Sequence, residues 1–171
     1  MNLDDLPPPE VMCEGRFVRL IKRGKWEYAS RANDIRAVVI LAETDGKMIL
    51  VDQPRVPLGA RCIELPAGLV GDEDHDATVE DTAVKELEEE AGFTAESIER
   101  LGDFHASPGM LSESFTLVRA HGVRRIGEGG GDDNEDIVVH LVARPDIPNF
   151  LEQKRAEGFA VDVKLLIFLN Y

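Results

Sequence analysis

Apolar residues alternate with polar ones, or form short runs, along much of the chain, which predicts a protein rich in β-strands. Segments of this kind cover residues 17–21, 25–31, 37–42, 48–53, 98–104, 113–120 and 137–143. The dipeptides Arg23-Gly24 and Asp45-Gly46 separate the first two pairs of segments. Because Gly favours tight turns between antiparallel strands, each of these pairs is predicted to form a hairpin.

One stretch follows a helical spacing instead, with apolar side chains four positions apart at Val79, Ala83, Leu87 and Ala91. We expect Thr78 to be the N-cap of this helix, with acidic residues in its first turn, and Gly92 to end it. Two closing helices are predicted over 149–157 and 162–169, and residues 1–16, which include three consecutive prolines, are predicted to be an extended lead-in. Residues 17–171 are then a single α/β (α+β) domain with a mixed central sheet between helices.

Composition limits the classes of function. A chain of 171 residues suits one domain with a real core, and its net charge of −14 argues against binding nucleic-acid polymers or an anionic membrane surface. A phosphate ligand remains compatible, because a bound metal ion inverts the local field. Two cysteines do not make a disulfide scaffold, no apolar run approaches the ~20 residues of a membrane span, and the N-terminus is acidic. A cytoplasmic location is therefore expected.

Three carboxylates, Glu86, Glu89 and Glu90, lie three and four positions apart within the predicted helix. At that spacing they share one helix face, so we expect their side chains to converge. Like charges placed together are unfavourable unless a cation lies among them, and Mg²⁺ or Mn²⁺ suits oxygen ligands of this kind. The alternative is a solvated acidic helix, which is the usual meaning of a Glu-rich run.

The residues around these carboxylates resemble the Nudix hydrolase family. Residues 85–93 (Lys-Glu-Leu-Glu-Glu-Glu-Ala-Gly-Phe) are similar to the second half of the Nudix box, with Lys85 in place of its Arg and Gly92 as its Gly. Residues 64–68 (Glu-Leu-Pro-Ala-Gly) are similar to the segment before the box in the ADP-ribose pyrophosphatase branch. The resemblance implies a Nudix-type α/β/α sandwich, makes the acidic helix a metal site and adds Ala67 to the metal ligands.

The first half of the box departs from the family pattern. Counting back from Lys85 places Gly71 at the box Gly and Ala77 where the first Glu belongs, whereas starting from Gly68 places Asp74 there, followed by three extra residues. We prefer the second alignment, because Gly68 follows Pro-Ala as it does in the family. The insertion then falls in a loop, where changes of length cost little. Asp74 and Lys85 are then structural positions of the box, although Lys lacks the planar fork of Arg.

A second acidic segment, residues 128–136, precedes the last predicted strand and combines three glycines with several carboxylates. Taken alone it indicates a flexible acidic loop. Residues 133–137 (Asp-Asn-Glu-Asp-Ile) are similar to a segment of bacterial ADP-ribose pyrophosphatases that supplies a late metal ligand and a candidate base for the attacking water. Carried over by position, these roles fall on Glu135 and, second to it, Asp133. Glu89 of the helix is the other candidate base.

Three further residues are candidates for binding substrate. Arg55 lies in a segment, residues 51–57, that is similar to a strand end of the same branch where an Arg contacts the pyrophosphate, and Arg31 is a second choice. Residues 107–109 (Ser-Pro-Gly) with Glu113 are similar to a family loop near the substrate ribose. The alternatives are surface arginines and a plain Pro-Gly turn.

These features predict a Mg²⁺-dependent pyrophosphohydrolase, with Mn²⁺ as a substitute, that acts on a nucleoside diphosphate linked to a further group and releases a nucleoside monophosphate. ADP-ribose, nucleotide sugars and free nucleoside di- or triphosphates all remain candidates as substrates. In the family a longer N-terminal strand region completes the adenine pocket in a homodimer, and here only about sixteen residues precede Phe17. A non-catalytic nucleotide-binding module of the same family is the alternative, although such modules usually lose the helix glutamates.

Overall fold

The structure is a computed structural model that describes residues 2–32, 35–71, 76–132 and 135–168. Its helices are α1 (Val79–Ala91), α2 (Ile147–Ala156) and α3 (Val163–Phe168), with short 3-10 turns at Leu3–Asp5, Val56–Leu58 and Arg144–Asp146. The strands are β1 (Glu10–Glu14), β2 (Val18–Arg23), β3 (Trp26–Arg31), β4 (Arg36–Leu41), β5 (Glu43–Thr44), β6 (Lys47–Arg55), β7 (Ala60–Glu64), β8 (Ala67–Val70), β9 (Phe93–Thr94), β10 (Ser97–His105), β11 (Ser114–His121), β12 (Arg124–Arg125), β13 (Val138–Ala143) and β14 (Ala160–Val161).

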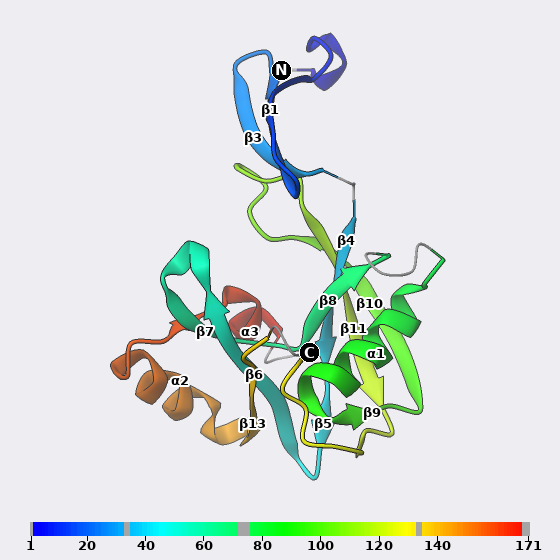
Figure 1. The fold of residues 1–171 in the computed structure, drawn as a ribbon, viewed down its shortest axis with the longest axis vertical. Coiled ribbons are helices and arrows are strands. Elements are labelled where there is room, and N and C mark those ends of the chain that lie inside the picture. Colours follow the sequence, from blue (N-terminus) through cyan, green and yellow to red (C-terminus); the bar gives the residue numbers. More distant parts are fainter. Residues whose placement is uncertain (1, 33–34, 72–75, 133–134, 169–171) are drawn as a thin grey trace.

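Two mixed sheets form the body of the molecule (Figure 1). One has the order β10-β11-β4-β8, in which β11 and β4 are parallel and the other pairs antiparallel. The other has the order β13-β6-β7-β14, in which β7 and β14 are parallel, and β5 pairs with β6 outside this path. Short strands β9 and β12 pair with each other beyond the end of α1.

Strand β4 shows how the layers are arranged, because its side chains alternate between two cores. Val38 and Ile40 pack in a cluster with the apolar face of α1, whereas Val39 and Leu41 pack in a cluster that includes residues of α2 and α3. Helix α1 therefore covers one side of the sheets and α2 and α3 cover the other (Figure 1). This arrangement confirms the predicted α/β/α class with a mixed sheet.

Helix α1 forms where the sequence predicts it and for the predicted reasons. The Thr78 side chain accepts a hydrogen bond from the Asp81 backbone, and the Asp81 side chain accepts one from the Thr78 backbone, so the N-terminus has a capping box. Gly92 ends the helix in the left-handed conformation (φ 74°), which Gly adopts without steric cost. Ala83, Leu87 and the last residue of the helix, Ala91, are fully buried against the sheets.

Strands β1, β2 and β3 form a separate antiparallel sheet that extends from the body (Figure 1). Its first strand lies within residues 1–16 and pairs with β2. The β2–β3 hairpin turns at Gly24 (φ 61°), as predicted. The loop that follows β10 joins this sheet to the body, because Ala29 donates a backbone hydrogen bond to Met110 and accepts one from Ser112.

Most predicted segments agree with the structure within a few residues, including the β5–β6 turn, where Asp45 and Gly46 both have positive φ. Strands β1, β7 and β8 and the short strands β5, β9, β12 and β14 were not predicted. The predicted end of the last helix, Leu169, lies outside the described residues. Within the part of the chain that the structure describes, no helix combines the length and apolar character needed to cross a membrane.

Candidate active site

An open cleft of about 1280 Å³ lies between the two sheets and α1. It is lined by nearly all the described residues that the sequence singles out, namely Arg31, Arg55, Ala67, Gly68, Lys85, Glu86, Glu89, Glu90, Glu113 and Glu135. Gly92 is not part of the lining and serves instead to end α1. Asp74 and Asp133, the other two predicted site residues, lie outside the described residues.

Among the described acidic residues that line the cleft, Glu90 is the most buried, with 3% of its surface exposed. Its Oε2 accepts a hydrogen bond of 3.0 Å from the backbone N–H of Ala67, at the start of β8. The pKa of Glu90 is raised to about 8, chiefly by burial and also by the charges of Glu86 and Glu135, against the lowering effects of the Ala67 N–H and Arg55. Glu90 is thus a buried carboxyl that gains most from a nearby cation.

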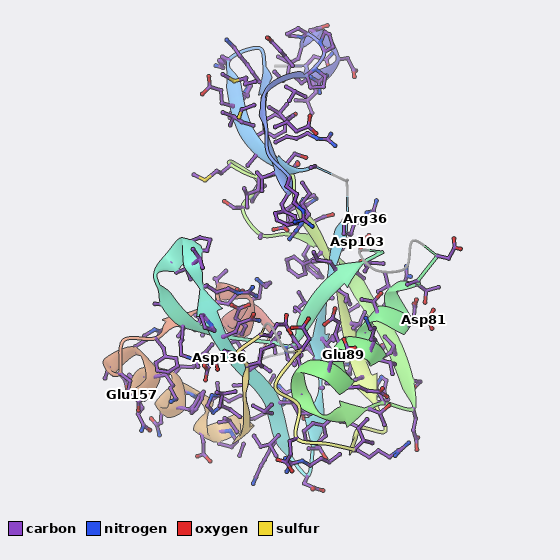
Figure 2. All side chains as sticks on the ribbon, viewed as in Figure 1. Arg36, Asp81, Glu89, Asp103, Asp136 and Glu157 are labelled. Carbon is purple, nitrogen blue, oxygen red and sulfur yellow. The ribbon has the colours of Figure 1, made fainter. Side chains whose placement is uncertain are left out.

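Glu86 and Glu89 flank this buried carboxyl in different environments. A Cβ on Gly68 would overlap the carboxyl of Glu86, so the glycine of the Glu-Leu-Pro-Ala-Gly segment leaves the space that the Glu86 side chain occupies. Glu89 is half exposed, and its Oε2 lies 3.7 Å from the Nζ of Lys85 (Figure 2). Lys85, at the Arg position of the box, therefore lies near a carboxylate of α1, and it offers that carboxylate a single point charge where Arg would offer a planar fork.

Arg55 is held by an acidic residue that sequence reasoning did not assign to the site. Its Nε and Nη2 donate to the two carboxylate oxygens of Glu64 at 2.7 and 2.8 Å. Glu64 is buried, and its hydrogen bond is the main reason that the pKa of Arg55 is raised. The bidentate pair fixes the plane of the guanidinium at the cleft wall. The signal was available, because Glu64 is the acidic residue of an otherwise apolar segment.

Arg31 and Glu113, predicted separately as substrate contacts, form an ion pair with each other. Arg31 Nε donates to Glu113 Oε1 at 2.7 Å, although the two residues are 82 positions apart. Arg31 ends β3 of the N-terminal sheet, whereas Glu113 immediately precedes β11 of the body. The pair therefore joins the N-terminal sheet to the body along the lining of the cleft.

Glu135 reaches the cleft from the segment that precedes β13. Its Oε2 accepts a hydrogen bond of 3.2 Å from the Asp132 N–H, and the side chain is exposed. The preceding glycines are packed on the end of α1, since the N–H groups of Gly130 and Gly131 donate to the carbonyls of Glu90 and Glu89 at 2.9 and 3.0 Å. This contact satisfies carbonyls that the end of a helix otherwise leaves unpaired.

The donor set suits a divalent metal ion of the Mg²⁺ type. Among the described residues that line the cleft, nine carry carboxylates and four carry cationic side chains, which is an unfavourable surface for a phosphate without added positive charge. Hard cations of this class prefer such oxygen ligands. As the described side chains stand, no three His, Cys, Asp or Glu residues are already arranged to hold an ion. Convergence of the three helix glutamates on one point thus stays a prediction.

The C-terminal part of the chain supplies a wall that the sequence did not indicate. Asp162 and Lys164 line the cleft beside Phe115, with Lys164 Nζ 5.7 Å from the centre of its ring. The Asp162 N–H donates to the Ile63 carbonyl of β7, which fixes this segment against the sheet. Neither residue belongs to a motif, so proximity in the fold is the only signal for them.

An α/β fold with a buried glutamate on a helix and a fixed arginine across an acidic cleft defines an enzyme that handles phosphate groups. Comparisons with known proteins agree. The NUDIX domain family matches residues 32–159. The chain is 37% identical over 170 residues to a methanol dehydrogenase activator of Bacillus methanolicus, covering 95% of this chain and 88% of that one. It is 38% identical over 122 residues to an ADP-ribose pyrophosphatase of Bacillus subtilis (strain 168), covering 69% and 63%.

A solved structure described as an ADP compounds hydrolase has the same fold, with a TM-score of 0.67 at 20% identity, over 90% of this chain and 94% of that one. The chain belongs to the Nudix family, and the resemblance drawn from its sequence is confirmed. It is a Nudix hydrolase, a class that acts on phosphoric anhydride bonds, and its relatives include several ADP-ribose pyrophosphatases.

Proposed function

We propose that the protein is a Mg²⁺-dependent pyrophosphohydrolase that cleaves ADP-ribose or a related nucleoside diphosphate linked to a further group, with release of a nucleoside monophosphate. The observation that carries this proposal is the buried Glu90 carboxyl, with a pKa raised to about 8, between Glu86 and Glu135 in a cleft that also contains Arg55. A carboxyl in that position is stabilised in its charged form by a cation, and an anionic pyrophosphate is stabilised by the same cation.

The metal site would be formed by the glutamates of α1, Glu86, Glu89 and Glu90, with Glu135 and the Ala67 carbonyl as further ligands. Ala67 has only this oxygen to offer, because its N–H is bonded to Glu90. Mg²⁺, or Mn²⁺ in its place, would neutralise charge on the phosphate oxygens and acidify a bound water. The requirement that Glu90 lose its proton before it can bind the ion follows from its raised pKa.

The protein's own side chains then have separate tasks. Arg55 binds the pyrophosphate with the guanidinium edge that Glu64 does not occupy, and the Glu64 pair keeps its orientation before substrate arrives. Arg31 and Glu113 contact the substrate at the mouth of the cleft. Glu135 accepts the proton of the attacking water, with Asp133 and Glu89 as the alternative bases.

Two findings favour an ADP-ribose type of substrate over free nucleotides. Several relatives are ADP-ribose pyrophosphatases, and the structural neighbour acts on ADP compounds. The cleft, at about 1280 Å³, is large enough for a substrate with groups on both sides of the pyrophosphate. Free nucleoside di- and triphosphates and nucleotide sugars are the competing substrates.

The test is a panel of ADP-ribose, nucleotide sugars and free nucleotides, each incubated with Mg²⁺ and with EDTA, with products identified by chromatography. We expect AMP and ribose 5-phosphate from ADP-ribose with Mg²⁺ and no products in EDTA. Preferred turnover of free triphosphates would overturn the substrate assignment. Binding of ADP-ribose without turnover of any compound would support a nucleotide-binding module instead. Glu128→Gln, a change at an exposed carboxylate outside the cleft lining, is the matched control.

We also propose that the enzyme is a cytoplasmic homodimer that pairs through its N-terminal sheet. Large apolar side chains stay exposed on or beside this sheet, including Phe17 (66%), Val18 (54%) and Trp26 (45%). A second copy that covers them would remove this apolar surface from water. Sedimentation analysis of the wild type and of Phe17→Ser with Val18→Thr tests the proposal: a dimer that becomes a monomer is expected, and a wild-type monomer would overturn it.

A further inference from the structure

A network of four charged or ionisable side chains lies behind the cleft, and none of them was assigned a role. Asp52 of β6 is 2% exposed and accepts hydrogen bonds from Arg61 of β7 and, at 2.6 Å, from the Nε2 of His140 of β13. The His140 ring packs against Phe150 of α2, with 5.1 Å between the ring centres. These contacts fix the Arg61 side chain at one end.

The other end of the Arg61 guanidinium reaches the segment that carries Glu135. Arg61 Nη1 bonds to the Asp136 carboxylate at 2.5 Å, and Nη2 donates to the Asp136 backbone carbonyl at 2.9 Å. Asp136 follows Glu135 directly in the chain, and Figure 2 shows Asp136 on the side of β6, with Glu89 on α1. A planar fork can hold a side chain and a carbonyl of one residue at once, which an ammonium group does with less geometric control.

The same segment is fixed to α1 at its beginning. Gly129 has a positive φ of 70°, and a Cβ there would lie 2.6 Å from the Glu90 carbonyl oxygen, so the loop can approach the helix end this closely only with glycine. Gly130 and Gly131 donate to carbonyls of α1, as described above. Along the chain, Glu135 therefore lies between two fixed points. One is the contact of Gly130 and Gly131 with α1, and the other is the contact of Asp136 with Arg61.

We propose that Arg61 is a positioning residue for Glu135, which it holds toward the helix glutamates by clamping Asp136 to the buried Asp52. The inference rests on the proposed catalytic role of Glu135. Residues that orient a catalytic group through one intervening contact typically change activity by about 10- to 100-fold when they are replaced. A purely structural role for the network would instead change stability and affect every activity of the enzyme equally.

The experiment compares Arg61→Lys with Arg144→Lys, each alone and combined with Glu135→Gln, under saturating Mg²⁺ and ADP-ribose. Arg144 pairs with Glu43 at the opposite end of the β6–β13 strand pair and is the matched control. Arg61→Lys should lower kcat by about 10- to 100-fold with a smaller change in KM. In the Glu135→Gln background it should lower kcat no further, because the group that it positions is already absent.

Asp136→Ala is the second variant, in case Arg61→Lys does not fold. It leaves the contact between Arg61 and the buried Asp52 in place and replaces a side chain that is 71% exposed. We expect Asp136→Ala to lower kcat less than Arg61→Lys does. In the Glu135→Gln background it should lower kcat no further. An equal loss in both backgrounds, or no loss from either variant, would overturn the positioning role while leaving the proposed function intact. Full activity of Glu135→Gln would overturn the catalytic role of Glu135 and, with it, the positioning role of Arg61, while another base would serve the proposed function.

Amide exchange provides a readout that needs no substrate. The N–H of Glu135 bonds to the Asp132 carbonyl at 3.1 Å, and that of Ile137 bonds to the Gly130 carbonyl at 3.3 Å. If Arg61 holds this segment, NMR should show both amides exchanging at least about tenfold faster in Arg61→Lys than in the wild type. They should be unchanged in Arg144→Lys. Equal exchange in wild type and Arg61→Lys would contradict the proposal whichever substrate the enzyme uses.

Discussion

Replacing Glu90 by Gln should make the metal-free protein increasingly more stable than the wild type as the pH rises. The substitution keeps the size of the side chain and an oxygen that can accept the Ala67 N–H, but it removes the buried ionisable group. The folded protein holds the Glu90 proton up to about pH 8, whereas the ordinary pKa of this group is 4.5. Between these values the native state binds more protons than the unfolded state, so the free energy of unfolding falls as the pH rises.

The size of the effect follows from the two pKa values. Each unit of difference corresponds to about 1.4 kcal/mol, and the group is half ionised in the folded protein at the upper value. From about pH 6 to about pH 8, Glu90 alone should therefore remove about 2 kcal/mol from the stability of the metal-free wild type. Glu90→Gln should not show this loss, because it has no proton to release.

Urea unfolding in EDTA at both pH values, for the wild type and the variant, measures this difference. The stability of Glu90→Gln relative to the wild type should increase by about 2 kcal/mol at the higher pH. Glu89→Gln, at a half-exposed carboxylate of the same helix, is the control and should show no such increase. Added Mg²⁺ should reverse the order, because it stabilises only a protein that can bind it. A gap between variant and wild type that is the same at both pH values would refute the burial argument.

Three further predictions follow from the site. The affinity for Mg²⁺ should rise by up to about tenfold per pH unit until about pH 8, because Glu90 must lose its proton before it binds the ion. Calorimetry in two buffers should detect the released proton, and binding without proton release would contradict this prediction. Arg55→Met should destabilise the fold by about 2 kcal/mol, because it leaves the buried Glu64 without its partner, and it should also raise KM. An unchanged urea midpoint would argue against a stabilising ion pair between Arg55 and Glu64. In single-turnover kinetics Glu135→Gln should lower kcat by about 10²–10⁴-fold and Glu128→Gln should not; equal, mild effects would place the base on α1.

The local signals in the sequence were enough for the helix that carries the glutamates. Thr78 with Asp81 forms the cap, Gly92 forms the stop, and the apolar positions four apart form the buried face. Each of these depends on residues within one or two turns, so no knowledge of the rest of the fold was required. The turn at Asp45-Gly46 followed in the same way, although the two strands predicted on either side of it, β4 and β6, belong to different sheets and only the short β5 pairs with β6.

The missed elements lack such local patterns. Strand β1 is exposed along its whole length, so its residues show no alternation of burial, and it forms a strand by pairing with β2. Strand β8 follows Pro66 and includes Gly68, two residue types that usually indicate turns. It becomes a strand because it pairs with the buried β4.

Partners distant in the sequence could not be predicted from one chain. Asp52 and His140 are 88 positions apart, and their contact depends on the register between β6 and β13. Arg31 and Glu113 were each selected through a resemblance, yet nothing in the sequence indicated that they bind each other. Ten of the described residues that line the cleft were thus predictable one by one, whereas the pairing that orients them required the fold.

We propose that the buried carboxylate of α1 supports metal-dependent cleavage of a nucleotide anhydride. The most direct test is the rate of AMP release from ADP-ribose at saturating Mg²⁺ for the wild type and Glu90→Gln, with unfolding curves to show that both proteins are folded. We expect turnover by the wild type, none in EDTA, and a rate for Glu90→Gln lower by orders of magnitude. Equal rates for the two folded proteins would contradict this role of Glu90.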